Sequence, residues 1–341
     1  MTGRGVRRRF TRRDKRKLGI LLILAGLTVI AAALFMRYWD EQQYRTEGGT
    51  SRVELETATG DARTFLYKGK NYEMRDDVDA YLIMGIDKND PVSRGSDAWD
   101  GGQADMIQVV VIDHAAKTWR LAAIDRNTIV PFEILTREGE SLGVQNEQIC
   151  LAHGFSYGLE DGCVKTADVV KDIFLNRKMN GYYALNMGGI ARLNDLLGGV
   201  KITVTDAFLE MDPDLTVGEQ LTLDGKQAEV FVRARKGTSD PTNAKRMERQ
   251  REYLNGFITK ADSLGTQEVL NIYDNMMDYV VTNIGSGTFA NMLEVCRDYQ
   301  QLEPVTIKGE TVIEKGYEAF YMDSINRVET ALELFYRVNE G

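Results

Sequence analysis

The most apolar stretch of the chain, residues 18–36, reads LGILLILAGLTVIAAALFM and contains no charged residue. As a helix it would be about 28 Å long, at about 1.5 Å per residue, which matches the hydrocarbon core of a bilayer. Residues 1–17 before it carry nine Arg and Lys, and such charge marks the cytoplasmic side of a membrane span. The pattern predicts a cytoplasmic tail, one transmembrane helix and an external remainder. A cleaved signal peptide is the alternative, because Ala31-Ala32-Ala33 resembles a cleavage site.

After this run, a polar segment is followed by a long region in which strand and helix signals alternate. Residues 37–78 are polar and predict an extracellular stalk. Short apolar runs predict strands at residues 81–86, 106–113, 119–124, 200–204, 229–235 and 303–313. Helical spacing of apolar residues predicts helices at 164–174 and 186–199, and from about residue 244 with a break near 285–287. This alternation predicts one α/β domain over residues 79–341, a layered αβα arrangement with a central mixed β-sheet flanked by helices.

The charge of the chain is very unevenly distributed. The net charge is −9, while residues 1–17, with nine basic residues and one acidic residue, contribute +8. Subtracting that +8 from −9 leaves −17 for the rest of the chain. So acidic a body lacks the broad basic surface that nucleic acids require, and we expect no nucleic-acid partner.

Common catalytic and metal-binding signatures are absent from the sequence. There is no GxSxG nucleophile motif, no P-loop and no GxGxxG fingerprint. His114 lies in a predicted turn, and His153 is interpreted as a packed or hydrogen-bonded side chain rather than a pocket residue. The cysteines fit no metal spacing, so Cys150 and Cys163 are expected either to form a bridge or to remain buried thiols.

Two aspartates stand at the ends of predicted strands. Asp87 follows the strand at 81–86, and Asp105 precedes the strand at 106–113. If these strands are neighbours, both carboxylates lie at one edge of the sheet and could hold Mg²⁺ or Mn²⁺ together with substrate phosphates. The alternative is that both aspartates only cap or stabilise loops.

Arginines form the other candidate group. Arg126 stands just past the strand at 119–124, where its side chain is expected to turn outward into a cleft. Arg233 and Arg235, two residues apart, would share one face of the strand predicted at 229–235.

A predicted helix adds to this group. Arg246 and Gln250 are four residues apart and would share one helix face. Residues 231–252 hold seven Arg and Lys in total. Because guanidinium groups bind phosphate oxygens bidentately, the arginines predict a phosphate-binding site. An ion-paired surface is the alternative.

Five stretches of sequence, in this order and spacing, resemble the LytR–CpsA–Psr (LCP) family of cell-wall ligases. They are YLIMGID (81–87), ADMIQVVVID (104–113), LAAIDRNTIV (121–130), GYYALNMGGIARLNDLLGGV (181–200) and LDGKQAEVFVRARKG with RMERQREYL (223–254). The resemblance covers about residues 79–265. It implies an enzyme that moves an anionic glycopolymer, such as teichoic acid or capsule, from a polyprenyl-pyrophosphate carrier onto a peptidoglycan hydroxyl.

The resemblance also implies roles for the candidate residues. The acidic positions that match the family's metal site are Asp87 and Asp105. The positions that match its pyrophosphate-binding and catalytic residues are Arg126, Arg233, Arg235, Arg246 and Gln250. The basic tail, the membrane span and the external domain fit the same family.

The chain departs from the family pattern at two places. The family's Pro-Arg-Asp-Thr is Asp125-Arg126-Asn127-Thr128 here, so the carboxylate after the arginine is missing. The aspartate that usually precedes the helix arginine aligns with Asn243, unless Asp240 supplies it, which leaves the identity of a general base open. These departures keep one alternative open, a non-catalytic protein that binds polyprenyl pyrophosphate or wall polymer. A further alternative, a transcriptional attenuator, comes from the older family name.

Overall fold

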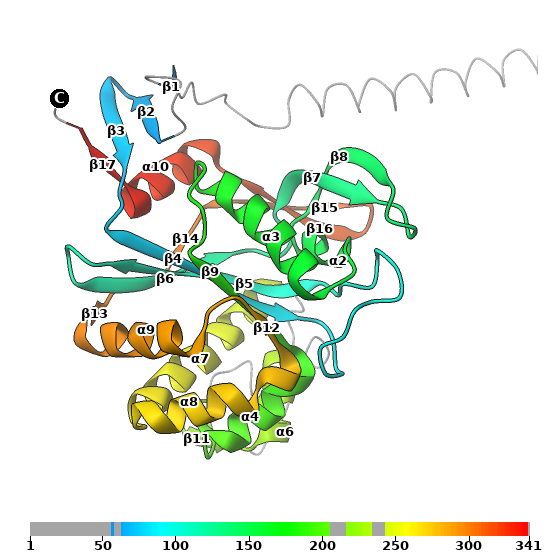
Figure 1. Cartoon of the computed structure of the whole chain (residues 1–341), viewed down its shortest axis with the longest axis vertical. Helices are drawn as coiled ribbons and strands as arrows, with labels where there is room; N and C mark the ends of the chain where they lie inside the picture. Colours follow the sequence, from blue (N-terminus) through cyan, green and yellow to red (C-terminus); the bar gives the residue numbers. More distant parts are fainter. Residues whose placement is uncertain (1–55, 58–62, 205–215, 234–242, 340–341) are drawn as a thin grey trace, which may run out of the picture. The chain divides into compact units, whose positions relative to one another are not determined.

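A computed structural model describes residues 56–57, 63–204, 216–233 and 243–339 (Figure 1). The predicted cytoplasmic tail and the predicted span at 18–36 lie outside these residues. Within the described residues, no helix is both long enough and apolar enough to cross a membrane. In helix α7 (Asn243–Asp262), the side chains of residues 243–248 are also outside the description.

A mixed seven-stranded sheet forms the centre of the fold, as the sequence predicts. Its strand order is β12-β9-β4-β5-β6-β13, and β14 also pairs with β6. The bounds are β4 (Val78–Ile86), β5 (Ala104–Asp113), β6 (Thr118–Ile124), β9 (Gly181–Asn186), β12 (Val280–Thr282), β13 (Gln300–Gln301) and β14 (Val305–Thr306). Strand β4 is antiparallel to β5 and parallel to β9. Both strands lie inside the sheet, and both faces of the sheet are covered. The side chains of β4 and β5 are therefore buried on both sides, and each strand is a nearly continuous apolar run.

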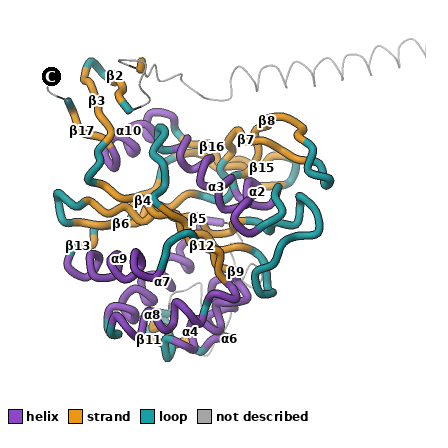
Figure 2. Tube along the Cα trace, viewed as in Figure 1, coloured by secondary structure: helices purple, strands orange, loops and turns teal. Residues whose placement is uncertain are grey.

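Helices cover both faces of this sheet (Figures 1 and 2). One face carries α2 (Cys150–Gly154), α3 (Leu159–Ile173) and α10 (Ser324–Phe335), and the other carries α7, α8 (Thr266–Asn275) and α9 (Ser286–Asp298). Alternate residues of β4 supply the two cores: Leu82 packs with α3 in one, and Tyr81 packs with the α9 side in the other. The structure therefore confirms the predicted αβα layering.

A smaller apolar cluster lies beside the sheet. It joins α4 (Ile190–Leu196), α6 (Gly225–Arg233) and the strand pair β10 (Val200–Thr203) and β11 (Gln220–Leu223). The strand predicted at 229–235 is wrong for residues 229–233, which belong to helix α6. Its buried positions are Gly225, Ala228, Phe231 and Val232, at i, i+3, i+6 and i+7, and this helical spacing outweighs the strand propensity of its β-branched and aromatic residues.

The predicted stalk is wrong for its second half. The strands β1 (Glu56–Thr57), β2 (Thr64–Tyr67) and β3 (Lys70–Met74) form a four-stranded sheet with the C-terminal β17 (Tyr336–Val338). Phe65 and Met74 are buried in the main core, so this segment belongs to the folded domain.

Two hairpins were also missed by the sequence reading. The first is β7 (Ile129–Leu135) with β8 (Ser141–Gln148), and the second is β15 (Gly309–Glu314) with β16 (Tyr317–Met322). The single strand predicted at 303–313 is divided between β14 and β15.

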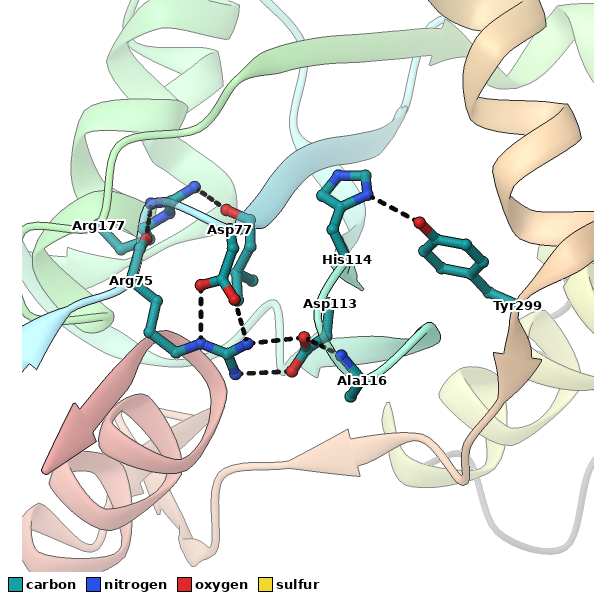
Figure 3. Close-up of polar contacts among 8 residues, drawn as sticks. Arg75, Asp77, Asp113, His114, Ala116, Arg177 and Tyr299 are labelled. Carbon is teal, nitrogen blue, oxygen red and sulfur yellow. Dashed lines mark hydrogen bonds and ion pairs between the residues drawn. The ribbon is translucent and has the colours of Figure 1, made fainter.

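A polar network ties together the start of β4 and the end of β5 (Figure 3). The guanidinium group of Arg75 donates two hydrogen bonds to Asp77 and two to Asp113, at 2.6–3.0 Å. These bonds hold the pKa of the Asp77 carboxyl below its usual value and outweigh the effect of burial, which alone would raise it. Beside this network, His114 contacts the Asp79 carboxylate at 3.0 Å and the Tyr299 hydroxyl at 3.2 Å.

Candidate functional site at the ends of the central strands

The two predicted metal-binding aspartates lie at the same edge of the sheet. In the antiparallel β4–β5 ladder, Ile86 is the partner of Ala104 and Gly85 is the partner of Met106, so Asp105 is the extra residue of a β-bulge, and Asp87 directly follows the last pair. Their surroundings differ, since the Asp105 side chain is only 6% exposed and the Asp87 side chain is 44% exposed. The pairing of neighbouring strands thus brings together two carboxylates 18 positions apart in the sequence.

Arg126 forms a buried ion pair with Asp105. Its Nη1 lies 2.6 Å from Oδ1 of Asp105, and its Nη2 donates to the amide oxygen of Gln103 and to Cys150 Sγ at 3.1 Å. The residue is only 8% exposed, so the expectation that it turns outward into an open cleft is wrong. Burial lowers the pKa of the guanidinium group, but the interactions with Cys150 and Asp105 outweigh it and raise the pKa.

One donor of Arg126 stands out. The buried Nε–H of this residue donates to no acceptor among the described residues. An unsatisfied buried donor costs about 1–3 kcal/mol, and such groups in folded proteins often meet a ligand or a water. Because a guanidinium nitrogen binds phosphate oxygens well, this feature suits an anionic ligand.

Arg233 reaches the same place from the last turn of α6. Its Nη2 lies 3.6 Å from Oδ1 of Asp87, and its Nη1 donates to Glu229 at 2.8 Å and to the side-chain oxygen of Asn89. The sequence reading placed Arg233 on a strand, which is wrong, yet its grouping of this arginine with Asp87 agrees with the contact. The Arg233 side chain is 28% exposed, so it remains accessible to a ligand.

Helix α7 holds the end of α6 in place. Arg249 Nε donates to the carbonyl oxygen of Phe231 at 3.1 Å, and Gln250 Nε2 donates to that of Val232 at 3.4 Å. Both side chains belong to buried residues, each 4% exposed. Gln250, predicted to bind substrate, therefore contacts the backbone that precedes Arg233. Arg249, which was not among the predicted site residues, adds a positive charge at a helix C-terminus, where it is favourable.

Three predicted site residues fall outside this description. Arg235 and Asp240 lie outside the described residues, and Arg246 lies in α7 at a position whose side chain is not described. Their convergence with Arg126 and Arg233 stays a prediction.

Residues far apart in the sequence complete the surroundings of Arg126. The Asn127 side chain donates to Oε2 of Glu318 at 2.9 Å, and Gln148 donates to the Glu318 carbonyl oxygen at 2.7 Å. The sequence reading did not find Glu318 or Gln148. No local pattern links Glu318 to Asn127, because 191 positions separate them.

A close backbone contact holds the segment after Asp87. The N–H of Gly188 donates to the carbonyl oxygen of Lys88 at 3.0 Å. A Cβ at position 188 would lie 1.8 Å from the carbonyl oxygen of Asn89, so only glycine fits there. The glycine pair in NMGGI, read as part of a helix from sequence, thus allows the segment with Asp87 and Asn89 to approach.

The carboxylates suit a hard divalent cation by their chemistry. Among the described residues, no three His, Cys, Asp or Glu side chains gather closely enough to form an all-protein metal site. Mg²⁺ needs fewer, since it commonly uses one or two carboxylates and completes its shell with water and substrate phosphates. Asp87 and Asp105 fit this donor set, although each contacts an arginine here.

The cysteines and His153 have structural surroundings. All three cysteines are free, and Cys150 and Cys163 are buried, so the buried-thiol alternative holds. Nδ1 of His153 contacts the carbonyl oxygen of Gly102 at 3.1 Å. Burial lowers the pKa of His153 to about 4, which keeps it neutral at physiological pH. His153 is thus a packed, hydrogen-bonded histidine, as the sequence indicates.

Comparison with known proteins identifies the family. The model of the LytR_cpsA_psr family matches residues 48–334. The chain belongs to this family. It is 26% identical over 260 residues to the polyisoprenyl-teichoic acid–peptidoglycan teichoic acid transferase TagU of Enterococcus faecalis, covering 74% of this chain and 78% of that protein.

A further relative, TagT of Bacillus subtilis, matches both by sequence and by structure. The transferase TagT is 26% identical over 298 residues, covering 83% of this chain and 81% of that protein. The structure of the LytR-CPS2A-psr family protein YwtF (TagT) with bound octaprenyl pyrophosphate lipid matches with a TM-score of 0.53 and 19% identity. This match covers 76% of this chain and 89% of that one, and it shows a shared fold.

Proposed function

We propose that this protein is a membrane-anchored phosphotransferase. It would move an anionic glycopolymer from a polyprenyl-pyrophosphate carrier onto a hydroxyl group of peptidoglycan, assisted by Mg²⁺ or Mn²⁺. The observation that carries the proposal is the meeting of Arg126 and Arg233 with Asp105 and Asp87 at one end of β4 and β5. A multiply charged diphosphate matches this arrangement of guanidinium groups, including the unsatisfied Nε of Arg126.

The named relatives support this choice of substrate class. TagU of Enterococcus faecalis and TagT of Bacillus subtilis bear names that describe transfer of teichoic acid from a polyisoprenyl carrier to peptidoglycan. The TagT structure with octaprenyl pyrophosphate shares the fold of this chain. Because family members share their fold, a polyprenyl pyrophosphate is the first donor to test.

The transfer requires positioning and charge neutralisation more than covalent chemistry. The acceptor hydroxyl oxygen attacks the phosphorus that bears the polymer, the bond from this phosphorus to the bridging oxygen breaks, and polyprenyl phosphate leaves. Arg126 and Arg233, with the predicted Arg235 and Arg246, would neutralise charge that develops on the leaving phosphate. The hydroxyl proton would pass to a carboxylate, for which Asp240 is the candidate.

A divalent cation would add to this charge neutralisation. Asp87 and Asp105 would hold it, and a bound Mg²⁺ supplies electrostatic stabilisation of phosphate oxygens. Asp105 and Asp87 also pair with Arg126 and Arg233, so their place in the fold does not depend on the cation alone. We therefore expect chelation with EDTA to lower the transfer rate without unfolding the protein.

The predicted anchor gives the enzyme its location. Residues 18–36 would span the cell membrane once, with residues 1–17 in the cytoplasm and the catalytic domain outside. That orientation would bring the site to the lipid carrier and to peptidoglycan. A transcriptional role fits poorly, because the chain after residue 17 carries a net charge of −17, obtained by subtracting the +8 of residues 1–17 from −9.

A reconstituted transfer reaction tests the proposal. Full-length protein in detergent is incubated with a synthetic polyprenyl-pyrophosphate saccharide, Mg²⁺ and peptidoglycan oligomers, and lipid and glycan products are separated by mass. Released polyprenyl phosphate together with ligated glycan supports the enzyme. Lipid that is bound but never processed supports the non-catalytic binding protein, and no binding at all contradicts both.

A further inference from the structure

The C-terminal hairpin β15–β16 touches the segment that carries Arg126. The N–H of Phe320 donates to the carbonyl oxygen of Asn127 at 2.9 Å, and Thr128 and Phe320 form an isolated parallel bridge. The hairpin thus pairs with the two residues that follow Arg126, Asn127 and Thr128.

Side chains strengthen this contact. Asn127 is 7% exposed, and its Nδ2 donates to Oε2 of Glu318 at 2.9 Å. Its own side-chain oxygen accepts a hydrogen bond from Gln148 Nε2 at 3.2 Å, and the same amide group donates to the Glu318 carbonyl oxygen at 2.7 Å. Asn127 is therefore held from two elements, β16 and the end of β8.

The end of β8 leads directly to a second contact with Arg126. The N–H of Cys150, two residues after Gln148, donates to the carbonyl oxygen of Arg126 at 3.1 Å. The Cys150 thiol in turn accepts from Arg126 Nη2 at 3.1 Å. Hydrogen bonds therefore link Glu318, Asn127 and Gln148, and the chain continues from Gln148 through Ile149 to Cys150, which bonds both the backbone and the guanidinium group of Arg126.

We propose that Glu318 is a positioning residue of the transferase, which acts through Asn127 to fix the Arg126 guanidinium group for the pyrophosphate. This inference rests on the proposed function, because it assumes that Arg126 contacts the donor. It makes the C-terminal hairpin, which lies outside the five stretches that resemble the family, a support of Arg126.

The chemistry explains why asparagine follows the arginine in this chain. An amide at position 127 offers a donor to the Glu318 carboxylate, whereas an aspartate there would place two carboxylates about 2.9 Å apart. Like charges at hydrogen-bond distance repel each other. Asn127 and Glu318 therefore form a matched pair, in which a carboxylate at position 127 requires an amide at position 318.

This reciprocity allows a double-mutant test. Asn127→Asp alone places a second carboxylate against that of Glu318. The double change Asn127→Asp with Glu318→Gln again pairs an amide with a carboxylate, in exchanged positions. We expect Asn127→Asp to lower kcat about tenfold, with KM for the lipid within about threefold, because Arg126 acts on charge in the transition state. The double variant should recover to within about threefold of Glu318→Gln alone, since contacting residues couple.

A second pair of variants guards against misfolding of Asn127→Asp. Glu318→Ala removes the acceptor, whereas Glu318→Gln retains an amide oxygen that can accept from Asn127, so activity should fall in the first and persist in the second. Glu314→Gln is the matched control, because this carboxylate lies in the same hairpin but accepts from Tyr321 at 2.7 Å. Its kcat should equal that of the wild type, and melting temperatures of all variants are recorded.

The outcomes separate this inference from the proposed function. Wild-type protein that transfers no polymer contradicts the proposed function, and the inference falls with it. Wild-type transfer combined with independent, multiplicative effects of the Asn127 and Glu318 changes overturns the inference alone. Equal loss in Glu318→Gln and Glu318→Ala also overturns it, and rescue in the double variant supports it.

Discussion

Replacing Arg126 by lysine tests whether the fork of the guanidinium group, rather than its charge, serves the reaction. In the structure, Nη1 contacts Asp105 at 2.6 Å while Nη2 contacts Cys150 at 3.1 Å. A lysine has a single ammonium group, which can keep the ion pair with Asp105 but cannot also reach Cys150 or present an Nε–H. The buried ion pair would therefore survive in part, and the protein should remain folded.

The size of the effect follows from the contacts that are lost. One hydrogen bond lost within the fold costs about 1 kcal/mol of stability. Loss of a preorganised donor to the developing charge costs about 3–4 kcal/mol of transition-state stabilisation, or about 10²–10³-fold in kcat. We therefore expect Arg126→Lys to transfer polymer at least about a hundredfold more slowly, with a small fall in melting temperature.

The assay measures release of polyprenyl phosphate from a synthetic polyprenyl-pyrophosphate saccharide under single-turnover conditions. Arg120→Lys is the matched control: this arginine lies on β6 and pairs with Glu333 at 2.9 Å, where the Glu333 side chain is 62% exposed. An exposed pair contributes little, so this control should keep wild-type turnover. Turnover of Arg126→Lys at the wild-type rate would refute the reasoning from fork geometry.

Three further predictions concern stability and local structure. Burial lowers the pKa of His153 to about 4 from its usual 6.5, so the unfolded chain binds this proton more readily than the folded one. The contribution of neutral His153 to folding stability is therefore complete above pH 6.5 and is lost as the pH falls toward 4. Urea unfolding should thus show about 2 kcal/mol less stability at pH 5 than at pH 7.5, and His153→Gln should remove this difference; an unchanged difference would be evidence against the assignment. Gly188→Ala, which puts a Cβ against Asn89, should abolish transfer and destabilise the fold by about 1–3 kcal/mol, while Gly287→Ala, which meets no atom within 4 Å, should not; normal transfer by the first variant would contradict the close approach. Arg75→Met leaves the carboxylates of Asp77 and Asp113 without this partner and should lower the free energy of unfolding by about 2 kcal/mol. A melting temperature equal to that of the wild type would show that the network in Figure 3 does not stabilise the fold.

The central strands could be predicted from sequence, because a strand that is buried on both faces has a continuous run of apolar residues. The runs that end before Asp87 and begin after Asp105 fall within β4 and β5, and their pairing brings the two carboxylates together. Helix α6 could not be predicted in the same way. Its residues 229–233, EVFVR, hold the β-branched and aromatic residues that are typical of strands, and their packing against α4 and α7 selects the helix.

The surroundings of the arginines depend on contacts that the sequence does not encode locally. The position of Arg126 just after a strand predicts a side chain that points into a cleft. Instead, its ion pair with Asp105, on the neighbouring strand, holds the guanidinium group in the interior. The Asn127–Glu318 contact joins the middle of the chain to its C-terminal hairpin, across 191 positions. The N-terminal strands were read as a stalk because their apolar positions are few, and their sheet is completed only by β17 at the opposite end of the chain.

The central claim is that Arg126 and Arg233 recognise a diphosphate, and a comparison of two lipids measures this directly. Calorimetric titration of the full-length protein in detergent with a polyprenyl pyrophosphate and with the matching monophosphate, both in Mg²⁺, gives the two Kd values. The account predicts at least about tenfold tighter binding of the pyrophosphate, a preference that Arg233→Ala reduces, since a charge-assisted hydrogen bond contributes about 1.5–3 kcal/mol. Equal affinity for the two lipids, or a preference untouched by the loss of Arg233, would contradict it.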